Sequence, residues 1–570
     1  MAGGKCGRTL LALGAVLALG VRLGSAAEDK DEPLVVATKY GLLEGKRVSV
    51  KGAPKPAYSY LAIPFAKPPV GPLRFSAPQA AEAWTGIRQA TNHAPGCLQD
   101  AKLMDLIKDF IKVSVPPSTF TEDCLYLNVY TPVRPKDTNK RLPVMVWIHG
   151  GAFVLGDALL YDGSALAAYE DVVVVVVQYR LGLLGFLSTG DEHLPGNWGL
   201  LDQVAALKWV QENIESFGGD PGSVTIFGES AGGMSVSLHI VSPLSAGLFH
   251  KAISESGTSL IKTAKDPDPK SFARIIANMT GCDSDHSWEI VDCLRKRSEE
   301  EILNLTSSTV FHSLLVVDGF FLPRDPEQLI EAGEVNSVPY LLGVNNHECG
   351  WMLAKMLNPP GWEEGMDRET SMSAFKIIKL LNEEGHLQQA FDEYMGDTQD
   401  KIEIRDRQLE LMGDVLMLVP TVRAARFHRD VGNSVFLYEF QHRPSIYGTS
   451  RPEFVKSDHG DELGFVFGAA FWSGDLVLLA NVTDEELVLS RTMMAYWANF
   501  AKKGDPNGEG LILWPVYDHN ESYMQLNLVP EVGRKLKEHR VKFFTETLQQ
   551  KVGKESEQQA TDDEQQRIEL

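Results

Sequence analysis

The sequence "VTIFGESAGG", which runs from Val224 to Gly233, joins a run of β-forming residues to a serine flanked by glycines. Gly228 and Gly232 stand two residues before and two residues after Ser230, and the following "MSVSLHIV" favours a helix. Glycines at both flanks indicate a backbone that turns too sharply to admit side chains there. The pattern predicts a strand, a tight turn and a helix, with Ser230 at the apex of the turn.

Three apolar runs that do not alternate with polar residues predict strands buried on both faces of a sheet. They are "LPVMVWIHGG" (142–151), "DVVVVVVQYR" (171–180) and "SVTIFG" (223–228). Between the second and third, residues 197–219 have the apolar spacing of a helix. Strand, helix and strand in series imply a right-handed crossover. We therefore predict an α/β fold with a doubly wound, mostly parallel sheet and helices on both faces.

Ligands of such sheets bind at the carboxyl ends of the strands, which is where Ser230 is expected. Residues 337–346 and 434–442 predict further strands, and the apolar spacing of residues 532–548 predicts a last helix. The sequence has no linker rich in Pro, Gly or Ser and no internal repeat. We therefore expect a single domain with inserted loops, from residue 28 to residue 552.

The composition of the chain fits a globular protein, and its charge argues against a nucleic-acid partner. The chain has 570 residues, of which 44% are hydrophobic and 23% charged, as in globular proteins with a large core. Its 54 basic and 76 acidic residues give a net charge of -22, which repels nucleic acid. A small molecule is therefore a better candidate partner for this negatively charged chain.

The first residues have the pattern of a secretory signal. Lys5 and Arg8 precede an apolar run from Thr9 to Val21, and the small residues 24–27 precede Glu28. A membrane anchor is the alternative, but this run is shorter than the roughly 20 residues that a membrane span needs. We predict a signal peptide over residues 1–27 and no transmembrane segment.

Secretion allows the cysteines to form disulfides. Cys6 is removed with the signal. We expect Cys97 to pair with Cys124 and Cys282 with Cys293, because each pair is close in sequence and brackets loop-like residues. Cys349 is then unpaired. Four sequons agree with this compartment, with candidate glycosylation sites at Asn278, Asn304, Asn481 and Asn520.

A serine hydroxyl is a weak nucleophile, so it needs a base, an acid that orients the base, and donors for the oxyanion. The oxyanion donors are suggested by Gly150 and Gly151, after the predicted strand at 142–148. Paired glycines let backbone N–H groups approach a substrate closely, and the N–H of Ala231 completes the predicted oxyanion hole.

Several longer motifs carry a resemblance to a known family. They are "EDCLYLNVYTP" (122–132), "WIHGGAF" (147–153), "GNWGLLDQ" (196–203), "GESAGG" (228–233), "GVNNHECGW" (343–351) and "DHGDE" (458–462). In this order they resemble the type-B carboxylesterases of the α/β-hydrolase fold, and most of all the vertebrate liver-type enzymes of the endoplasmic reticulum. The resemblance covers nearly the whole chain after the signal.

The resemblance implies a catalytic triad of Ser230, Glu348 and His459. The residues support it independently, because Glu348 follows the predicted strand at 339–344 and His459 lies in a late loop, in the order serine, acid, histidine. His347 is a rival for the base, but adjacent side chains point apart, so Glu348 could hardly orient it.

Other residues near the predicted triad leave alternatives open. Asp458, Asp461 and Glu462 are rivals for the acid. Cys349 stands where relatives usually carry Phe, and we expect it to be a small buried thiol.

The predicted function is a serine carboxylesterase that acts through an acyl-enzyme on xenobiotic and lipid-type esters, with thioesters and amides as further substrates. It requires no metal or organic cofactor.

One alternative is a catalytically silent adhesion module of the same fold, but here all three triad positions are filled. Another is a cholinesterase. Those enzymes hold choline with a Trp before "EDCLYLN", whereas residues 97–124 contain Phe110 and Phe120 but no Trp.

The chain ends in an acidic, Gln-rich tail, residues 553–570. Its last residues, Arg567-Ile568-Glu569-Leu570, resemble the K-D-E-L and H-D-E-L signals of the endoplasmic reticulum and the His-x-Glu-Leu endings of liver-type carboxylesterases. We predict that a retrieval receptor binds this end and keeps the protein in the lumen. Secretion is the alternative.

Overall fold

The computed structural model of the chain describes residues 33–137, 139–309, 312, 314–377 and 384–548. The predicted signal peptide (1–27) and tail (553–570) lie outside these residues, and the domain limits 28 and 552 stay a prediction. No helix in the described ranges is long and apolar enough to cross a membrane.

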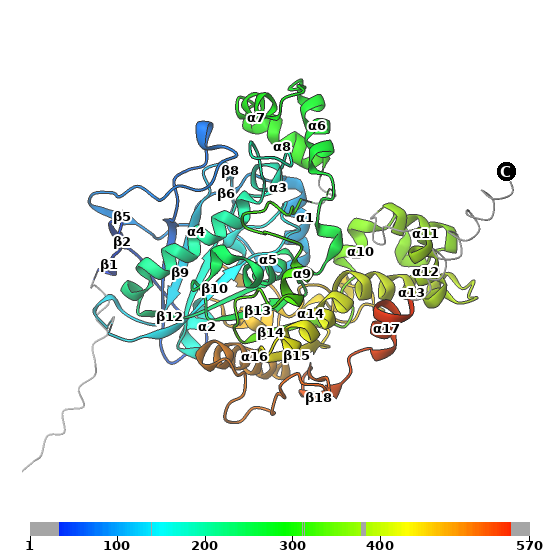
Figure 1. The fold of residues 1–570 in the computed structure, drawn as a ribbon. Helices are drawn as coiled ribbons and strands as arrows, with labels where there is room; N and C mark the ends of the chain where they lie inside the picture. Colours follow the sequence, from blue (N-terminus) through cyan, green and yellow to red (C-terminus); the bar gives the residue numbers. More distant parts are fainter. Residues whose placement is uncertain (1–32, 138, 310–311, 313, 378–383, 549–570) are drawn as a thin grey trace, which may run out of the picture. The chain divides into compact units, whose positions relative to one another are not determined.

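A large mixed sheet organises the described residues (Figure 1). Its strands follow the order β18 (Glu531–Arg534), β17 (Ser522–Leu526), β15 (Val435–Phe440), β14 (Tyr340–Asn345), β13 (Lys251–Glu255), β12 (Gly219–Glu229), β10 (Leu142–Ile148), β11 (Val173–Val177), β9 (Tyr126–Thr131), β4 (Ala57–Pro64) and β3 (Lys46–Val48). The strands from β17 to β11 in this order run parallel, and the pairs at both edges are antiparallel. The predicted α/β class with a mostly parallel sheet is confirmed.

The centre of the sheet is the crossover that the apolar runs predict. Val146 of β10 pairs with Val175 of β11 on one side and with Ile226 of β12 on the other. Helix α4 (Trp198–Asn213) connects β11 to β12 and therefore passes across β10. Every residue of β11 is buried, because helices cover both faces of the sheet.

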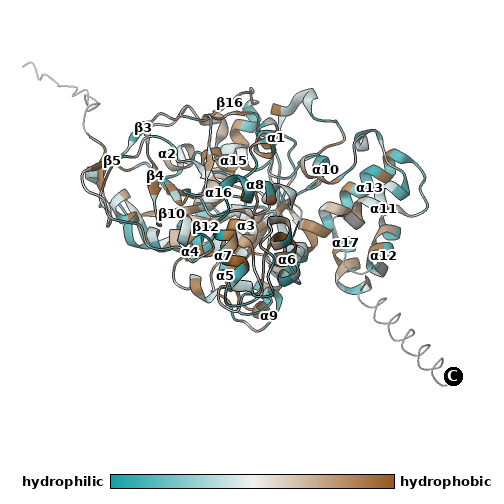
Figure 2. Cartoon of the chain, turned by 90° about the horizontal axis from the view of Figure 1, so that it is seen from above, coloured by the Kyte–Doolittle hydropathy of each residue, from teal (hydrophilic) through white to brown (hydrophobic). Residues whose placement is uncertain are grey.

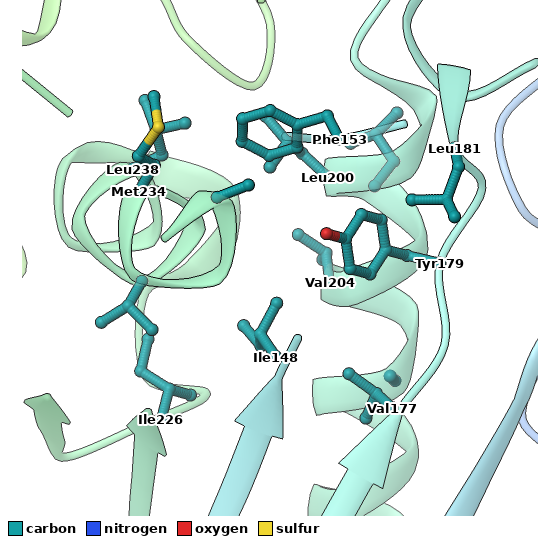
Figure 3. Packing of buried hydrophobic residues seen from close by; sticks show 14 of the residues in the cluster. Ile148, Phe153, Val177, Tyr179, Leu181, Leu200, Val204, Ile226, Met234 and Leu238 are labelled. Atoms are coloured by element: carbon teal, nitrogen blue, oxygen red, sulfur yellow. The ribbon is translucent and has the colours of Figure 1, made fainter. Parts of the chain in front are cut away.

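One face of the sheet packs against α4 and α5 (Ala231–Val241). Figure 3 shows Ile148, Val177 and Ile226 of the three central strands beneath α4, which carries Val204, and α5. The opposite face carries Trp147, which shares a second core with residues of α2 (Ser164–Glu170) and α16 (Asp484–Lys503). The two cores hold β10 and β12 in place from opposite faces of the sheet, and the candidate site forms where these strands end.

Inserted helices extend beyond the sheet. Both views show α11 (Arg368–Ile377), α12 (Glu384–Met395), α13 (Lys401–Gly413) and α17 (Glu538–Lys542) gathered on the same side (Figures 1 and 2). Phe391 of α12 and Leu409 of α13 share a third core with Phe543, and Phe110 of α1 (Ala101–Ile111) also belongs to it. The helical surfaces in Figure 2 carry both hydrophilic and hydrophobic residues, as expected for helices with one buried face.

The predicted last helix, 532–548, is partly wrong. Residues Glu531–Arg534 form strand β18, which pairs with β17 and places Val532 opposite Met524. The tight turn that follows has positive φ at Lys535 and Lys537, which ends the strand before the helical residues 538–547 begin. The helical spacing of Val532 with later apolar residues was coincidental, because edge pairing decides the structure here.

Candidate active site

Ser230 occupies the single residue between the end of β12 and the start of α5. Its backbone has φ 55° and ψ -123°, a conformation that residues other than glycine rarely adopt. The Ser230 N–H donates to the carbonyl of Glu255 at 2.9 Å, and its carbonyl accepts from the Met234 N–H at 2.8 Å. The surrounding backbone therefore holds the serine in a strained turn.

The glycines beside Ser230 have no room for a side chain. A Cβ on Gly228 would lie 2.5 Å from the Ile148 carbonyl oxygen, and one on Gly232 would lie 2.0 Å from the same atom. A Cβ on Gly257 would lie 2.1 Å from the Ser230 carbonyl oxygen. The "G-E-S-A-G" sequence thus lets the turn pack directly against β10.

The predicted oxyanion donors lie beside this turn. A Cβ on Gly150 would lie 3.0 Å from the Ser230 Cβ, and Gly151 has a positive φ of 103°. Ala231 is the first residue of α5, where a helix leaves its N–H groups without helical partners. Gly150 and Gly151 line the same cavity as Ser230.

The neighbouring His149 supports this glycine loop. Its ring stacks on Tyr179 at 4.5 Å, and its Nδ1 bonds the Gly150 carbonyl at 2.9 Å. Burial lowers the pKa of His149 to about 4, so its imidazole is neutral at pH 7.

His459 and Glu348 lie together, as the sequence predicts. His459 Nδ1 is 2.6 Å from Glu348 Oε2, and both side chains are buried. The other carboxylate oxygen, Oε1, accepts from the Ser256 hydroxyl at 2.6 Å and from the Asn345 N–H at 2.7 Å. These two donors fix the carboxylate, so Glu348 can orient the imidazole.

The rival residues have other partners. His347 Nδ1 accepts from the Lys456 N–H at 3.2 Å, and burial lowers its pKa to about 3. Asp461 forms a two-pronged ion pair with Arg451 at 2.6 and 2.7 Å. Glu462 Oε2 accepts from the Asn345 amide at 2.6 Å.

Asp458 joins the histidine loop to a wall of the cavity. Its two carboxylate oxygens accept the N–H groups of Trp351 at 2.9 Å and Met352 at 2.8 Å, at the start of α10 (Met352–Leu357). Asp458 therefore accepts the first N–H groups of α10, and it directly precedes His459 in sequence. The Asp458 carboxylate thus connects the loop that carries His459 to the start of α10.

Glu229 is the residue of this site that the sequence analysis missed. Its Oε1 lies 3.0 Å from His459 Nε2, so two carboxylates flank the imidazole. Burial alone would lower the pKa of His459, but Glu229 and then Glu348 offset this effect and raise the pKa well above its ordinary value of 6.5. The only sequence signal was the position of Glu229 directly before the serine.

Ser230 and His459 line a cavity of about 280 Å³. Its walls are mainly apolar and come from α1 (Ala101–Ile111), from α10 and from α15 (Leu463–Val466). Contributing side chains include Met104, Ile107, Phe110, Met352, Leu353 and Phe465. Apolar walls of this kind favour an apolar ligand.

The predicted disulfides are formed. Cys97 bonds Cys124 with an S–S distance of 2.06 Å, and Cys282 bonds Cys293 at 2.10 Å. Cys349 is the free cysteine of the described residues, and it is fully buried, where burial raises the pKa of its thiol. It packs among the side chains around α10, next to Glu348 in sequence.

The four sequon asparagines are all exposed. Asn278 lies on α6 (Pro269–Thr280), and Asn304 lies on α8 (Glu299–Ser308). Asn481 lies just before α16, and Asn520 lies just before β17.

The chain is similar to known proteins over nearly its whole length. The family model described as the carboxylesterase family matches residues 32–544. Carboxylesterase 5A of Canis lupus familiaris is 48% identical over 548 residues, which are 96% of this chain and 94% of the relative. The medium-chain fatty acyl-CoA hydrolase precursor of Anas platyrhynchos is 47% identical, over 95% of this chain and 97% of the relative. Liver carboxylesterase of Sus scrofa is 47% identical, over 92% and 94%.

A match of this length and identity shows the family. The chain belongs to the carboxylesterase family, and it is a carboxylic ester hydrolase of the α/β-hydrolase fold.

Proposed function

We propose that the chain is a serine carboxylesterase in which Ser230 is the nucleophile, His459 the base and Glu348 the orienting acid. The observation that carries the proposal is the 2.6 Å contact between His459 and Glu348 beside a cavity that Ser230 also lines. A neutral imidazole whose Nδ1–H is held by a carboxylate can accept a proton at Nε2. In the structure Nε2 lies 3.0 Å from Glu229 Oε1, so it must leave this contact to take the proton of Ser230.

In the acylation step, the Ser230 oxygen attacks the ester carbonyl carbon while His459 Nε2 takes the hydroxyl proton. The N–H groups of Gly150, Gly151 and Ala231 stabilise the oxyanion that forms. When the tetrahedral intermediate collapses, the bond to the alcohol oxygen breaks and His459 returns the proton to that oxygen. Water, deprotonated by the same histidine, then attacks the acyl-enzyme and releases the acid.

The walls of the cavity favour a broad class of neutral substrates. Their apolar side chains contact acyl or alcohol groups without demanding a particular polar partner. Xenobiotic esters and lipid-type esters fit this description. The name of the Anas platyrhynchos relative also supports thioesters as substrates, and amides require the same chemistry with a poorer leaving group.

The proposal is tested by removing each triad residue in turn. We expect Ser230→Ala, His459→Ala and Glu348→Gln to lower kcat on p-nitrophenyl butyrate, with the first two losses similar because the residues act as a unit. Ser473→Ala is the matched control, because its exposed hydroxyl bonds only a backbone carbonyl in the structure. A folded Ser230→Ala variant with wild-type turnover would refute the assignment.

We further propose that the protein resides in the lumen of the endoplasmic reticulum, and that a retrieval receptor binds Arg567–Leu570. Two disulfides and four exposed sequon asparagines support an oxidising, secretory compartment. The full-length chain should stay in cells, whereas a chain that ends at Gln566 should appear in the medium. Equal export of both would instead favour a secreted protein.

A further inference from the structure

We propose that Asn481 carries an N-linked glycan at the rim of the catalytic cavity, and that this glycan restricts the enzyme to esters dissolved as single molecules. The inference rests on the proposed function and on the proposed secretory route. The inference narrows the proposed substrate class, because it distinguishes dissolved esters from esters held in a lipid surface.

The rim beside Asn481 is a small antiparallel pair of strands. β16 (Val477–Leu478) pairs with β7 (Val113–Ser114), which places Leu478 opposite Val113. Both of these residues line the catalytic cavity. The Leu479 N–H donates to the Lys112 carbonyl at 2.9 Å, directly after α1. This pair of strands therefore forms part of the cavity wall at the protein surface.

Asn481 comes shortly after β16 in the sequence. The asparagine is exposed, and its neighbour Val482 lines the cavity. Thr483 starts α16, where its hydroxyl accepts from the Glu486 N–H at 3.2 Å and the Glu486 carboxylate accepts from the Thr483 N–H at 2.9 Å. This capping box fixes the backbone, so a glycan on Asn481 has a fixed attachment point beside the cavity.

The other three sequons provide an internal comparison. Asn278, Asn304 and Asn520 are exposed as well, but none of the residues in their sequons lines the cavity. Glycans at those positions are attached to surfaces that take no part in the catalytic wall. Only a glycan at Asn481 is attached next to a residue that lines the cavity.

The chemistry of the rim indicates what a glycan would change there. Leu479 is 68% exposed and Val477 is 36% exposed, so apolar side chains face solvent beside the cavity. Exposed apolar residues of this kind can enter a lipid surface. An oligosaccharide is bulky and strongly hydrated, so it keeps this rim away from lipid while a dissolved ester diffuses past it.

The experiment compares variants of the full-length protein expressed in a mammalian secretory host. Asn481→Gln removes this glycan, Asn520→Gln removes one far from the cavity wall, and Thr483→Ser keeps both the sequon and the helix cap. Glycopeptide mass spectrometry measures occupancy at residue 481. Kinetics are measured on p-nitrophenyl butyrate below its solubility limit and on emulsified tributyrin.

We expect occupancy of Asn481 in the wild type and in Thr483→Ser. All variants should hydrolyse the dissolved ester at the wild-type rate, which reports the proposed function separately. Asn481→Gln should hydrolyse the emulsion several-fold faster than wild type, whereas Asn520→Gln and Thr483→Ser should not. An unoccupied Asn481, an emulsion rate equal to that of Asn520→Gln, or an equal gain on both substrates would overturn the inference.

Discussion

Gly232 shows how closely the turn around Ser230 is packed. The position that a Cβ would take lies 2.0 Å from the Ile148 carbonyl oxygen, which is a backbone atom and cannot rotate away. A methyl group there must push α5 away from β10. Because Ser230 lies between β12 and α5, its hydroxyl would move with the helix.

We therefore expect Gly232→Ala to lower kcat by about a hundredfold, since a shift of roughly 1 Å in a reacting group can cost that much. Overpacking should also cost about 1–3 kcal/mol of stability. Turnover and thermal unfolding measure the two effects. Gly222→Ala is the control, because its nearest neighbour is the flexible Asp220 side chain at 3.2 Å. Wild-type kcat in Gly232→Ala would show that the turn has more freedom than the structure allows.

His459 provides a prediction on pH. The proposed mechanism needs a neutral His459 imidazole, and Glu229 and Glu348 raise the pKa of His459 well above 6.5. The acidic limb of kcat/KM should therefore have its midpoint above about 6.5, and activity should fall as the pH drops through that midpoint.

Glu229→Gln removes one of the two charges, so the midpoint should move to lower pH. Glu212→Gln, which changes a carboxylate that is 40% exposed, should leave it unchanged. A pH–rate profile of the three proteins checks this. A midpoint that stays in place in Glu229→Gln would mean that Glu229 does not act on the catalytic histidine.

Some of these residue contacts could be predicted from sequence and others could not. The motif order predicted that Glu348 and His459 would meet, and their atoms lie 2.6 Å apart. For Glu229 the sequence offered only its position directly before the serine, which did not indicate that its carboxylate would approach the far nitrogen of the same ring. Its side-chain direction depends on the turn at Ser230 and on a loop far along the chain, and spacing alone does not encode that combination.

At the scale of elements, Asp458 connects the histidine loop to α10. It accepts the Trp351 and Met352 N–H groups, and Met352 and Leu353 line the cavity. The contact links the position of His459 to the position of a cavity wall. A change at Asp458 should therefore affect both binding and turnover.

Asp458→Asn keeps the volume but leaves only one oxygen to accept these two N–H groups. Leaving one buried N–H without an acceptor costs about 1–3 kcal/mol, so we expect kcat/KM to fall by roughly fivefold to a hundredfold. Steady-state kinetics should show changes in both kcat and KM. Asp397→Asn, on an exposed turn, should match the wild type. An effect on stability with unchanged kinetics would assign Asp458 a purely structural role.

The elements themselves were predictable where burial dictates the pattern. The runs at 142–151, 171–180 and 223–228 appear as β10, β11 and β12, because only a strand covered on both faces is apolar throughout. Strand β13 escaped prediction, since its sequence, "KAISE", mixes polar and apolar residues although all five are buried. Two of its polar side chains have partners inside the protein: Ser254 donates to the Gly233 carbonyl, and Glu255 Oε1 accepts from Trp497.

At the scale of the whole molecule, the cavity walls determine which esters fit. The segment between the first pair of bonded cysteines contributes Met104, Ile107 and Phe110. Trp472 also lines the cavity, but it comes from a later segment, after α15, and its side chain is buried. A quaternary ammonium group binds best over an open Trp face, and Phe110 is a weaker partner.

Butyrylthiocholine should therefore have a lower kcat/KM than an uncharged butyrate thioester of similar size. The comparison uses one enzyme preparation and the same thiol detection for both substrates. Equal values would favour the cholinesterase alternative.

The most direct test of the account is the position of the covalent intermediate. An organophosphate that reacts with serine hydrolases should add to the peptide that contains Ser230, and mass spectrometry locates the adduct. We predict one adduct per chain at Ser230 in the wild type, much slower labelling in His459→Ala, and no adduct in Ser230→Ala. An adduct at another residue, or labelling of folded Ser230→Ala at the wild-type rate, would contradict the assignment of this turn as the catalytic centre.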